Sequence, residues 1–215
     1  MQLPTRPYCE QLATWPDSGC HILAQYDDET IVVYQAYSAN IGQYAVEHGV
    51  FGGDFKYSRM SWIKPNFLWM MYRSSWGQAQ GQDVVLGIRI RRTFFDAILD
   101  QAIPSSFSSD LFADHDAWKR AVAQSDVRLQ WDPDHLHNGE NCQRRAIQLG
   151  LRGKALEAFG RQEIVEIIDM SDFVREQRRF IDNWQEGTLL TPVECVYEPK
   201  TPQTAARLGL SHVSN

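Results

Sequence analysis

The chain has 215 residues, enough for one domain with its own hydrophobic core, and a net charge of −6. That charge argues against a general nucleic-acid coat protein, and no apolar run reaches the roughly 18 residues of a membrane span. The four cysteines are dispersed without a C-x-x-C pair, so neither a disulfide framework nor a zinc site is expected. The N-terminus has no apolar signal core, and we expect a cytoplasmic protein with no membrane partner.

Hydrophobic periodicity, turn residues and caps predict a mixture of strands and helices. In chain order, these are two strands about an acidic turn at 21–37, a helix at 38–49, a helix at 65–74, a strand at 82–92, helices at 93–103 and 114–124, strands at 127–131 and 144–151, a helix at 154–160, a strand at 163–170 and a helix at 171–184. Ser38 and Ser171 are predicted caps, and Gly49 ends the first helix. Alternation gives the strand at 82–92 one apolar and one basic face.

These elements do not alternate regularly, which favours the α+β class over a doubly wound fold. We expect a single domain with a mixed, largely antiparallel β-sheet core flanked by helices. Its predicted bounds are 21–198, preceded by an N-terminal arm at 1–20 and followed by a flexible C-terminal tail at 199–215. The oligomeric state is not predictable from the sequence.

The segment RMSWIKPNFLWMMYRSSWG, residues 59–77, combines three tryptophans and three methionines with three cations and no acid. From Lys56 to Arg92 the chain has seven cations and one acid, so this island is basic within an acidic protein. It suits a compact anionic ligand, although its cations could equally pair with acids from elsewhere in the fold. Trp69 and Met70 are interpreted as core, and Trp76 as the tryptophan that lines a pocket.

Polar residues in otherwise apolar strands mark a second group of candidates. Gln35 is flanked by Tyr34 and Tyr37, and Gln148 lies near Arg145. A buried amide must be hydrogen-bonded, either to backbone or to a ligand. With Arg59, Arg73 and Arg145, these side chains suit a ribose and a pyrophosphate, because arginine reads phosphate bidentately.

The polar segment 132–141 is predicted to be a loop. It contains the only metal-like set of side chains, Asp132, Asp134, His135 and His137, at a spacing that is also typical of an exposed turn. We expect no metal there.

The segments TIVVYQAY, RMSWIKPNFLWMMYRSSWG and RRAIQLGL resemble the bacterial and fungal domain-of-unknown-function family 4291. This resemblance runs from about His21 to Val174 and implies kinship without an activity. The order of a strand, a helix and a segment with serine and aromatic residues also resembles the opening of ADP-ribosyltransferase-like domains. That second resemblance implies an ADP-ribosyltransferase-like fold with NAD as cofactor, and a nucleotide or a nucleic-acid end as ligand.

Under the second resemblance, Gln35 or Tyr34 takes the ribose-holding position on the first strand. Tyr72, Arg73 and Ser74 form the second element, and Gln148 stands in the third. Gln35, Arg73 and Gln148 are thus the candidate catalytic residues. The candidate ligand-binding residues are Tyr34, Tyr37, Arg59, Lys64, Tyr72, Ser74, Trp76 and Arg145.

The chain departs from the ADP-ribosyltransferase pattern, because the first position has no histidine or arginine and the third has no glutamate. A phosphate-directed enzyme like the RNA 2′-phosphotransferases, which rely on basic residues, therefore stays open. A non-catalytic module that binds a nucleotide or an RNA end is a further alternative. A protein-interaction domain is another, and it predicts Trp62 or Trp76 on an open surface with no pocket near Arg73.

Overall fold

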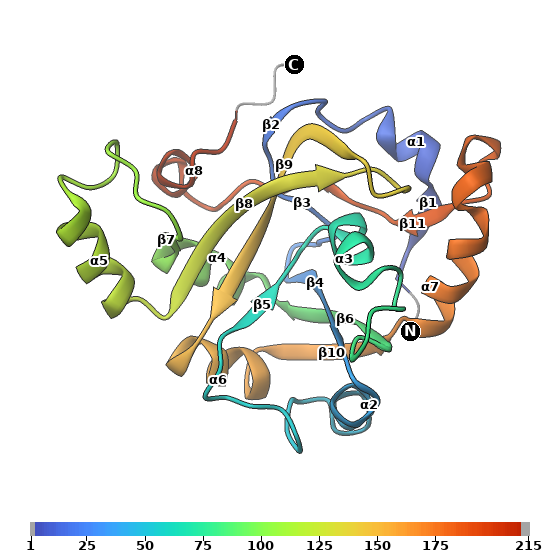
Figure 1. Cartoon of the computed structure of the whole chain (residues 1–215), viewed down its shortest axis with the longest axis horizontal. Coiled ribbons are helices and arrows are strands. Elements are labelled where there is room, and N and C mark those ends of the chain that lie inside the picture. The colour runs from blue at the N-terminus through green and yellow to red at the C-terminus, as the bar shows by residue number, and fades with distance from the viewer. Residues whose placement is uncertain (1–2, 212–215) are drawn as a thin grey trace.

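Two β-sheets form the centre of the protein, which a computed structural model describes over residues 3–211 (Figure 1). The first sheet is antiparallel in the order β10-β6-β4, with strands β4 (Thr30–Tyr37), β6 (Val84–Arg91) and β10 (Ile164–Asp169). The second has the order β2-β9-β8-β7, with β5 also paired to β9, and its strands are β2 (Gly19–Cys20), β5 (Ser61–Ile63), β7 (Ile103–Pro104), β8 (Val127–His135) and β9 (Asn141–Leu151). Among the described strands, only β2 with β9 and β7 with β8 pair in parallel, so the expectation of an α+β protein with a mixed, largely antiparallel sheet core is confirmed.

Helices surround both sheets, and two short ribbons tie the ends of the chain together. The helices are α1 (Tyr8–Leu12), α2 (Ala39–His48), α3 (Phe67–Ser74), α4 (Arg92–Gln101), α5 (His115–Gln124), α6 (Gly153–Arg161), α7 (Ser171–Gln177), the 3₁₀ helix η1 (Arg178–Glu186) and α8 (Pro202–Leu208). The ribbons pair β1 (Thr5–Pro7) with β11 (Leu190–Pro192), and β3 (Leu23–Ala24) with β12 (Cys195–Val196). Figure 1 shows α5 projecting at one end of the molecule and α7 with η1 at the other. Over residues 3–211, no helix combines the length and the apolar composition that a bilayer span needs.

The first sheet is buried on both faces. On β4, Ile31 and Val33 pack in one hydrophobic cluster, whereas Val32 and Tyr34 pack in a second cluster on the opposite face. On β6, Val84, Leu86, Ile88 and Ile90 pack in the first cluster and Val85 packs in the second, so both faces are covered and the predicted basic face reduces to arginines near the end of the strand. Of these, Arg89 forms ion pairs with acids outside the strand.

The two sheets meet where β4 approaches β5. A backbone bridge joins Tyr34 to Lys64, which follows β5, with Tyr34 N donating to Lys64 O at 2.7 Å. One residue further along β4, Gln35 reaches β5 through its side chain. The sheets therefore part at this point, and the space between them is lined by side chains.

Half of the predicted loop at 132–141 is strand, and the loop itself is confined to 136–140. β8 continues to His135, and β9 begins at Asn141. The polar residues tolerate this because they have partners: Asp134 accepts from Arg144 Nε at 2.6 Å, and both side chains are buried. Within residues 3–211, no cluster of three or more histidine, cysteine, aspartate or glutamate side chains is placed to hold a metal ion.

Both ends of the chain are packed into the fold as far as the structure describes them. The predicted arm contributes β1, α1 and β2, and the buried Gln11 side chain donates to Thr191 Oγ1 at 2.7 Å. The segment expected to be a flexible tail contains α8, with Thr201 as its cap, Pro202 in its first turn and Leu208 buried. The remainder of that predicted tail, 212–215, lies outside the described residues.

Candidate functional site

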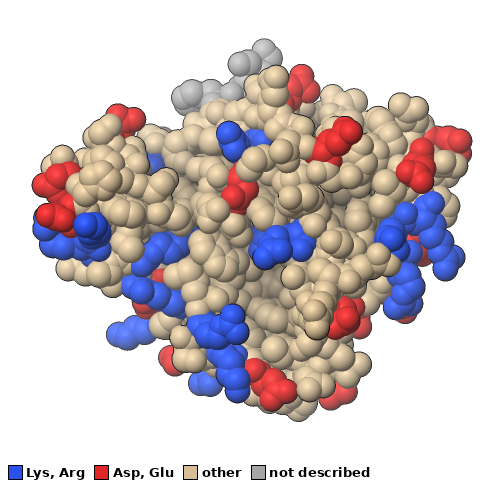
Figure 2. Space-filling view, in the orientation of Figure 1, with Lys and Arg blue, Asp and Glu red and all other residues tan. Residues whose placement is uncertain are grey.

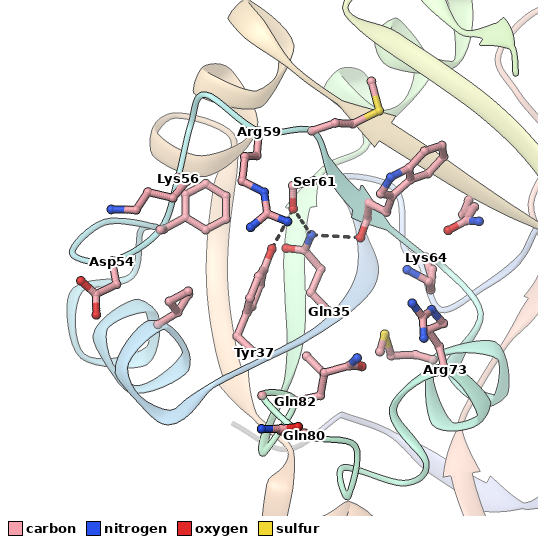
Figure 3. A pocket seen from close by; sticks show the side chains of 18 of the residues that line it. Gln35, Tyr37, Asp54, Lys56, Arg59, Ser61, Lys64, Arg73, Gln80 and Gln82 are labelled. Carbon is pink, nitrogen blue, oxygen red and sulfur yellow. Dashed lines mark hydrogen bonds between the residues drawn. The ribbon is translucent and has the colours of Figure 1, made fainter.

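A pocket of about 760 Å³ opens where the sheets part, between β4, β5 and α3. Figure 2 shows a hollow near the middle of this face, bordered by Lys and Arg side chains, and Figure 3 shows the pocket from close by. Its polar lining consists of Gln35, Tyr37, Asp54, Lys56, Arg59, Ser61, Lys64, Arg73, Gln80, Gln82, Gln130 and Gln148. This lining has four cations and one acid, so the pocket is electropositive within an acidic protein.

Gln35 anchors one wall of the pocket. Its Nε2 donates to Ser61 Oγ at 2.7 Å and to the Trp62 carbonyl at 3.0 Å, which fixes the amide plane (Figure 3). The Tyr37 hydroxyl lies 2.7 Å from the same Ser61 Oγ, and burial raises the pKa of this phenol, so it stays protonated. The wall therefore presents a fixed amide and two hydroxyls, groups that suit the hydroxyls of a sugar.

Lys64 is the most unusual group in the pocket. Its side chain is only 6% exposed, and its ammonium lies 5.4 Å from the centroid of the Trp69 ring. Burial lowers the pKa of this ammonium to about 8; the nearby charge of Arg73 acts in the same direction, and the charge of Asp132 acts against it. Among the described residues Lys64 forms no ion pair, and a buried cation without a partner is costly.

The local sequence explains why Lys64 and Arg73 face the same space. Pro65 separates the strand segment that carries Lys64 from α3, which carries Arg73. Asn66 caps α3, and its Oδ1 accepts from Trp69 N at 2.7 Å. The chain thus turns sharply between the two cations, and both side chains line the pocket (Figure 3).

A buried carboxyl group holds the start of α3 from the far end of the chain. Glu194 Oε1 accepts from Phe67 N at 2.6 Å, and Glu194 itself is 3% exposed. Burial raises the pKa of this carboxyl well above its usual range. Glu194 therefore positions the helix that carries Arg73.

The opposite wall is formed by amides on the second sheet. Gln130 and Gln148 face each other across β8 and β9. Both donate to Asp132, with Gln148 Nε2 2.7 Å from Oδ2 and Gln130 Nε2 2.8 Å from Oδ1. Each glutamine therefore directs an amide N–H toward this carboxylate, which lies on the same face of β8 as Gln130 but is not itself a lining residue.

Six of the predicted site residues line this one pocket, namely Gln35, Tyr37, Arg59, Lys64, Arg73 and Gln148. The other five lie outside its lining: Tyr34, Tyr72, Ser74, Trp76 and Arg145. The pocket beside Arg73 also runs against the protein-interaction alternative, which expected none there, and Trp62 belongs to the pocket lining.

The five residues outside the lining are held elsewhere for identifiable reasons. Tyr34 is fully buried against Phe67, and the Ser74 hydroxyl is fully buried and donates to Met70 O at 2.8 Å. Trp76, expected to line the pocket, packs instead in the second hydrophobic cluster. Arg145 is three residues from Gln148 on β9, so it points to the opposite face of the sheet. Tyr72 is exposed and stacks on His135.

Several lining residues were missed by sequence reasoning. Ser61 bonds to both Gln35 and Tyr37, but a single serine before an apolar strand gives no local indication of a site. Gln130 lies in β8, which was predicted to end at residue 131 and therefore not to pair along its length with the strand that carries Gln148. Its alternation with Asp132, opposite Gln148, is the pattern that could have found it.

The basic island divides into two groups. Lys56, Arg59, Lys64 and Arg73 line the pocket, and among the described residues they form no ion pairs. By contrast, Arg91 pairs with Glu163 and Arg92 hydrogen-bonds to Tyr197. The ligand interpretation thus fits the first half of the island and the structural interpretation the second half.

Comparison with known proteins identifies the family. No curated protein matches the chain. A family model described as "Domain of unknown function (DUF4291)" matches residues 21–197, which include every residue of the pocket lining. The chain therefore belongs to the DUF4291 family.

Proposed function

We propose that the pocket binds the ribose and pyrophosphate of a nucleotide, and that the protein is an ADP-ribosyltransferase-like enzyme that uses NAD. Nucleic-acid ends are the acceptors we favour. The observation that carries the proposal is Lys64, a buried ammonium that lines the pocket beside Arg73 and forms no ion pair with any described residue; Asp132 acts on it only at longer range. An anion in the pocket removes the cost of leaving this charge unpaired, and a pyrophosphate matches two adjacent cations.

The arrangement of the polar walls supports a nucleotide over a simple anion. The strand and helix of the ADP-ribosyltransferase resemblance correspond to β4, which carries Gln35, and α2. The expected second element, Tyr72, Arg73 and Ser74, lies on α3, and of these three Arg73 lines the pocket, opposite a wall where Gln35 bonds to Ser61 of β5. The third element is β9, which carries Gln148 on the facing wall. A sugar between these walls has amide and hydroxyl partners on both sides.

The proposed reaction breaks one bond and makes one. The C1′–N bond between ribose and nicotinamide breaks, and nicotinamide leaves as a neutral molecule with the bonding electron pair. A lone pair of the acceptor forms the new bond to C1′, and the acceptor's proton passes to solvent. Lys64 and Arg73 hold the pyrophosphate, and Gln35 orients the ribose so that C1′ faces the acceptor.

The test is calorimetric titration with NAD, ADP-ribose and AMP, together with an assay for released nicotinamide. We expect NAD and ADP-ribose to bind, and Lys64→Met and Arg73→Ala to weaken both by tenfold or more, since each removes a charge-assisted contact worth about 1.5–3 kcal/mol. Arg91→Gln is the matched control, because it removes a cation of the same segment that lies outside the pocket and pairs with Glu163. If none of these ligands binds, or if Arg73→Ala changes nothing, the proposal fails.

A second candidate function is binding without catalysis. It is favoured by Gln148, an amide on β9 at the position where the ADP-ribosyltransferase pattern has a glutamate. Gln148 cannot accept a proton, so the pocket is also suited to holding a nucleotide or RNA end without turnover. Binding with a steep salt dependence but no nicotinamide release would support this alternative. A phosphate-directed enzyme would instead remove the 2′-phosphate from an RNA that carries one, and that substrate belongs in the same assay.

A further inference from the structure

An aromatic platform lies beside the pocket and outside its lining. Tyr72 is 48% exposed, and one face of its ring stacks on His135 with a centroid distance of 3.5 Å and an interplanar angle of 13°. His135 is buried and contacts the Trp69 ring edge-to-face, with a centroid distance of 6.0 Å. The Tyr72 ring is therefore fixed on one side and half exposed, as a surface for stacking requires.

Trp69 connects this platform to the pocket. Its ring contacts Tyr72 at a centroid distance of 6.0 Å and lies 5.4 Å from the Lys64 ammonium. Arg73, which follows Tyr72 on α3, lines the pocket. A single nucleic-acid strand can thus place one of its bases on Tyr72 while the end of the strand lies near the pocket cations.

The platform is joined to an exposed arginine cluster on α7 and η1. Two residues after His135, His137 contacts Trp184 of η1 with a centroid distance of 4.8 Å. Arg175, Arg178 and Arg179 are exposed, and Figure 2 shows cations gathered over α7 and η1 on the same face as the hollow. Arg175 pairs with Asp172, whereas Arg178 and Arg179 form no ion pair within residues 3–211.

We infer that a single-stranded nucleic acid binds across this face, with a base stacked on Tyr72 and its backbone along Arg178 and Arg179. Stacked aromatics combined with unpaired cations are how proteins hold single strands, since every base has a π-face and every linkage a negative charge. A duplex keeps its bases inside the stack and cannot use Tyr72. This inference rests on the proposed function for the strand's role as acceptor, but strand binding itself needs no NAD.

The test is fluorescence anisotropy of a labelled strand of about ten nucleotides, as RNA and as DNA, against a duplex of the same sequence and without NAD. We expect the single strand to bind more tightly than the duplex, and Tyr72→Ala to weaken it by about 5- to 150-fold. Tyr72→Phe keeps the ring and is expected to bind like the unaltered chain. Arg178→Gln with Arg179→Gln is expected to reduce the slope of log affinity against log salt by about 1.4.

Lys119→Gln with Arg120→Gln is the matched control, since it removes two exposed cations on α5, at the other end of the molecule (Figure 1). Equal affinity for single strand and duplex overturns the inference, and so does unchanged binding by folded Tyr72→Ala. If Tyr72→Ala does not fold, an unchanged salt slope in the double arginine variant overturns it. A polyglutamate peptide that competes as well as the oligonucleotide would assign the surface to an acidic protein and would also overturn it. Because NAD titration is separate, loss of strand binding leaves the nucleotide pocket standing, and the reverse also holds.

Discussion

The charge of Lys64 destabilises the unliganded protein but favours the binding of an anion. Its ammonium is buried beside Arg73, and desolvation favours its neutral form. A pKa lowered from 10.5 to about 8 corresponds to a cost of roughly 3 kcal/mol in the folded state below pH 8. Such a cost at a pocket wall is typical of a residue kept for a ligand.

The first prediction is that Lys64→Met stabilises the unliganded protein. Methionine fills a similar volume without a charge, so the thermal midpoint at pH 7 is expected to rise by several degrees. The gain shrinks as the pH rises from about 8 to 10.5, because in that window the folded protein releases the Lys64 proton while the unfolded chain still holds it. Thermal unfolding from pH 7 to 10 measures it, and a lower midpoint for Lys64→Met at pH 7 would contradict the interpretation.

A second prediction concerns ligand affinity and pH. Below pH 8 Lys64 is charged before the nucleotide arrives, whereas above it binding must take up a proton. The affinity for ADP-ribose is therefore expected to fall by up to tenfold per pH unit above about 8. Calorimetry in buffers of different ionisation enthalpy detects the proton uptake at pH 8.5, and Lys64→Met should show neither the uptake nor the fall.

At the scale of single elements, the helix ends were only partly predictable. α2 follows Ser38 and ends at Gly49 in the left-handed conformation as expected, but the Ser38 side chain forms no cap hydrogen bond. Ser171, the other predicted cap, is instead the first residue of α7, and Met170 occupies the cap position. The proline and the spacing also located α3 to within two residues. The extension of β8 through Asp132 and Asp134 was not predictable, because the partners that satisfy these acids lie on β9 and local sequence does not reveal them. For the same reason Ser61 was missed and Trp76 was misplaced.

A third prediction tests how α3 is held. Glu194→Gln keeps an oxygen for Phe67 N but cannot ionise. Because burial raises the pKa of Glu194 in the folded state, its contribution to stability is fully present below about 4.5 and falls as the pH rises. Glu194→Gln is therefore expected to match the unaltered chain at pH 4.5 and to exceed it increasingly toward pH 8.

Glu194→Ala is the contrasting variant. It leaves the Phe67 N–H buried without an acceptor, which costs about 1–3 kcal/mol at any pH. Urea unfolding at several pH values separates the two substitutions. A Glu194→Gln variant that is less stable at pH 8 would show that the carboxylate, and not the neutral acid, holds α3.

At the scale of the whole molecule, the two ends of the chain brace the pocket without lining it. The Gln11 side chain accepts from Glu194 N at 2.9 Å, and Trp15 Nε1 donates to Glu194 O at 2.9 Å. The sequence correctly predicted an antiparallel α+β core and several pocket residues, but not this long-range bracing. Periodicity reports neighbours along the chain, whereas β1 and β11 pair across nearly its whole length.

A fourth prediction follows for truncation. Removing residues 1–16 leaves Glu194 without Gln11 and Trp15, so the start of α3 loses its support. We expect a lower thermal midpoint and weaker ADP-ribose binding, although none of the deleted residues lines the pocket. Nucleotide affinity equal to that of the full chain would contradict this account.

The bond between Glu194 and Phe67 spans 127 positions, and this separation bears on how the protein is made. At about 5–20 residues per second, a ribosome adds Glu194 on the order of ten seconds after Lys64. Throughout that interval the nascent chain exposes Lys64 and the apolar residues of α3 before their last support exists. The pocket is thus completed late in synthesis, and a ribosome-stalled chain is expected to gain nucleotide binding only after residue 194 has left the exit tunnel.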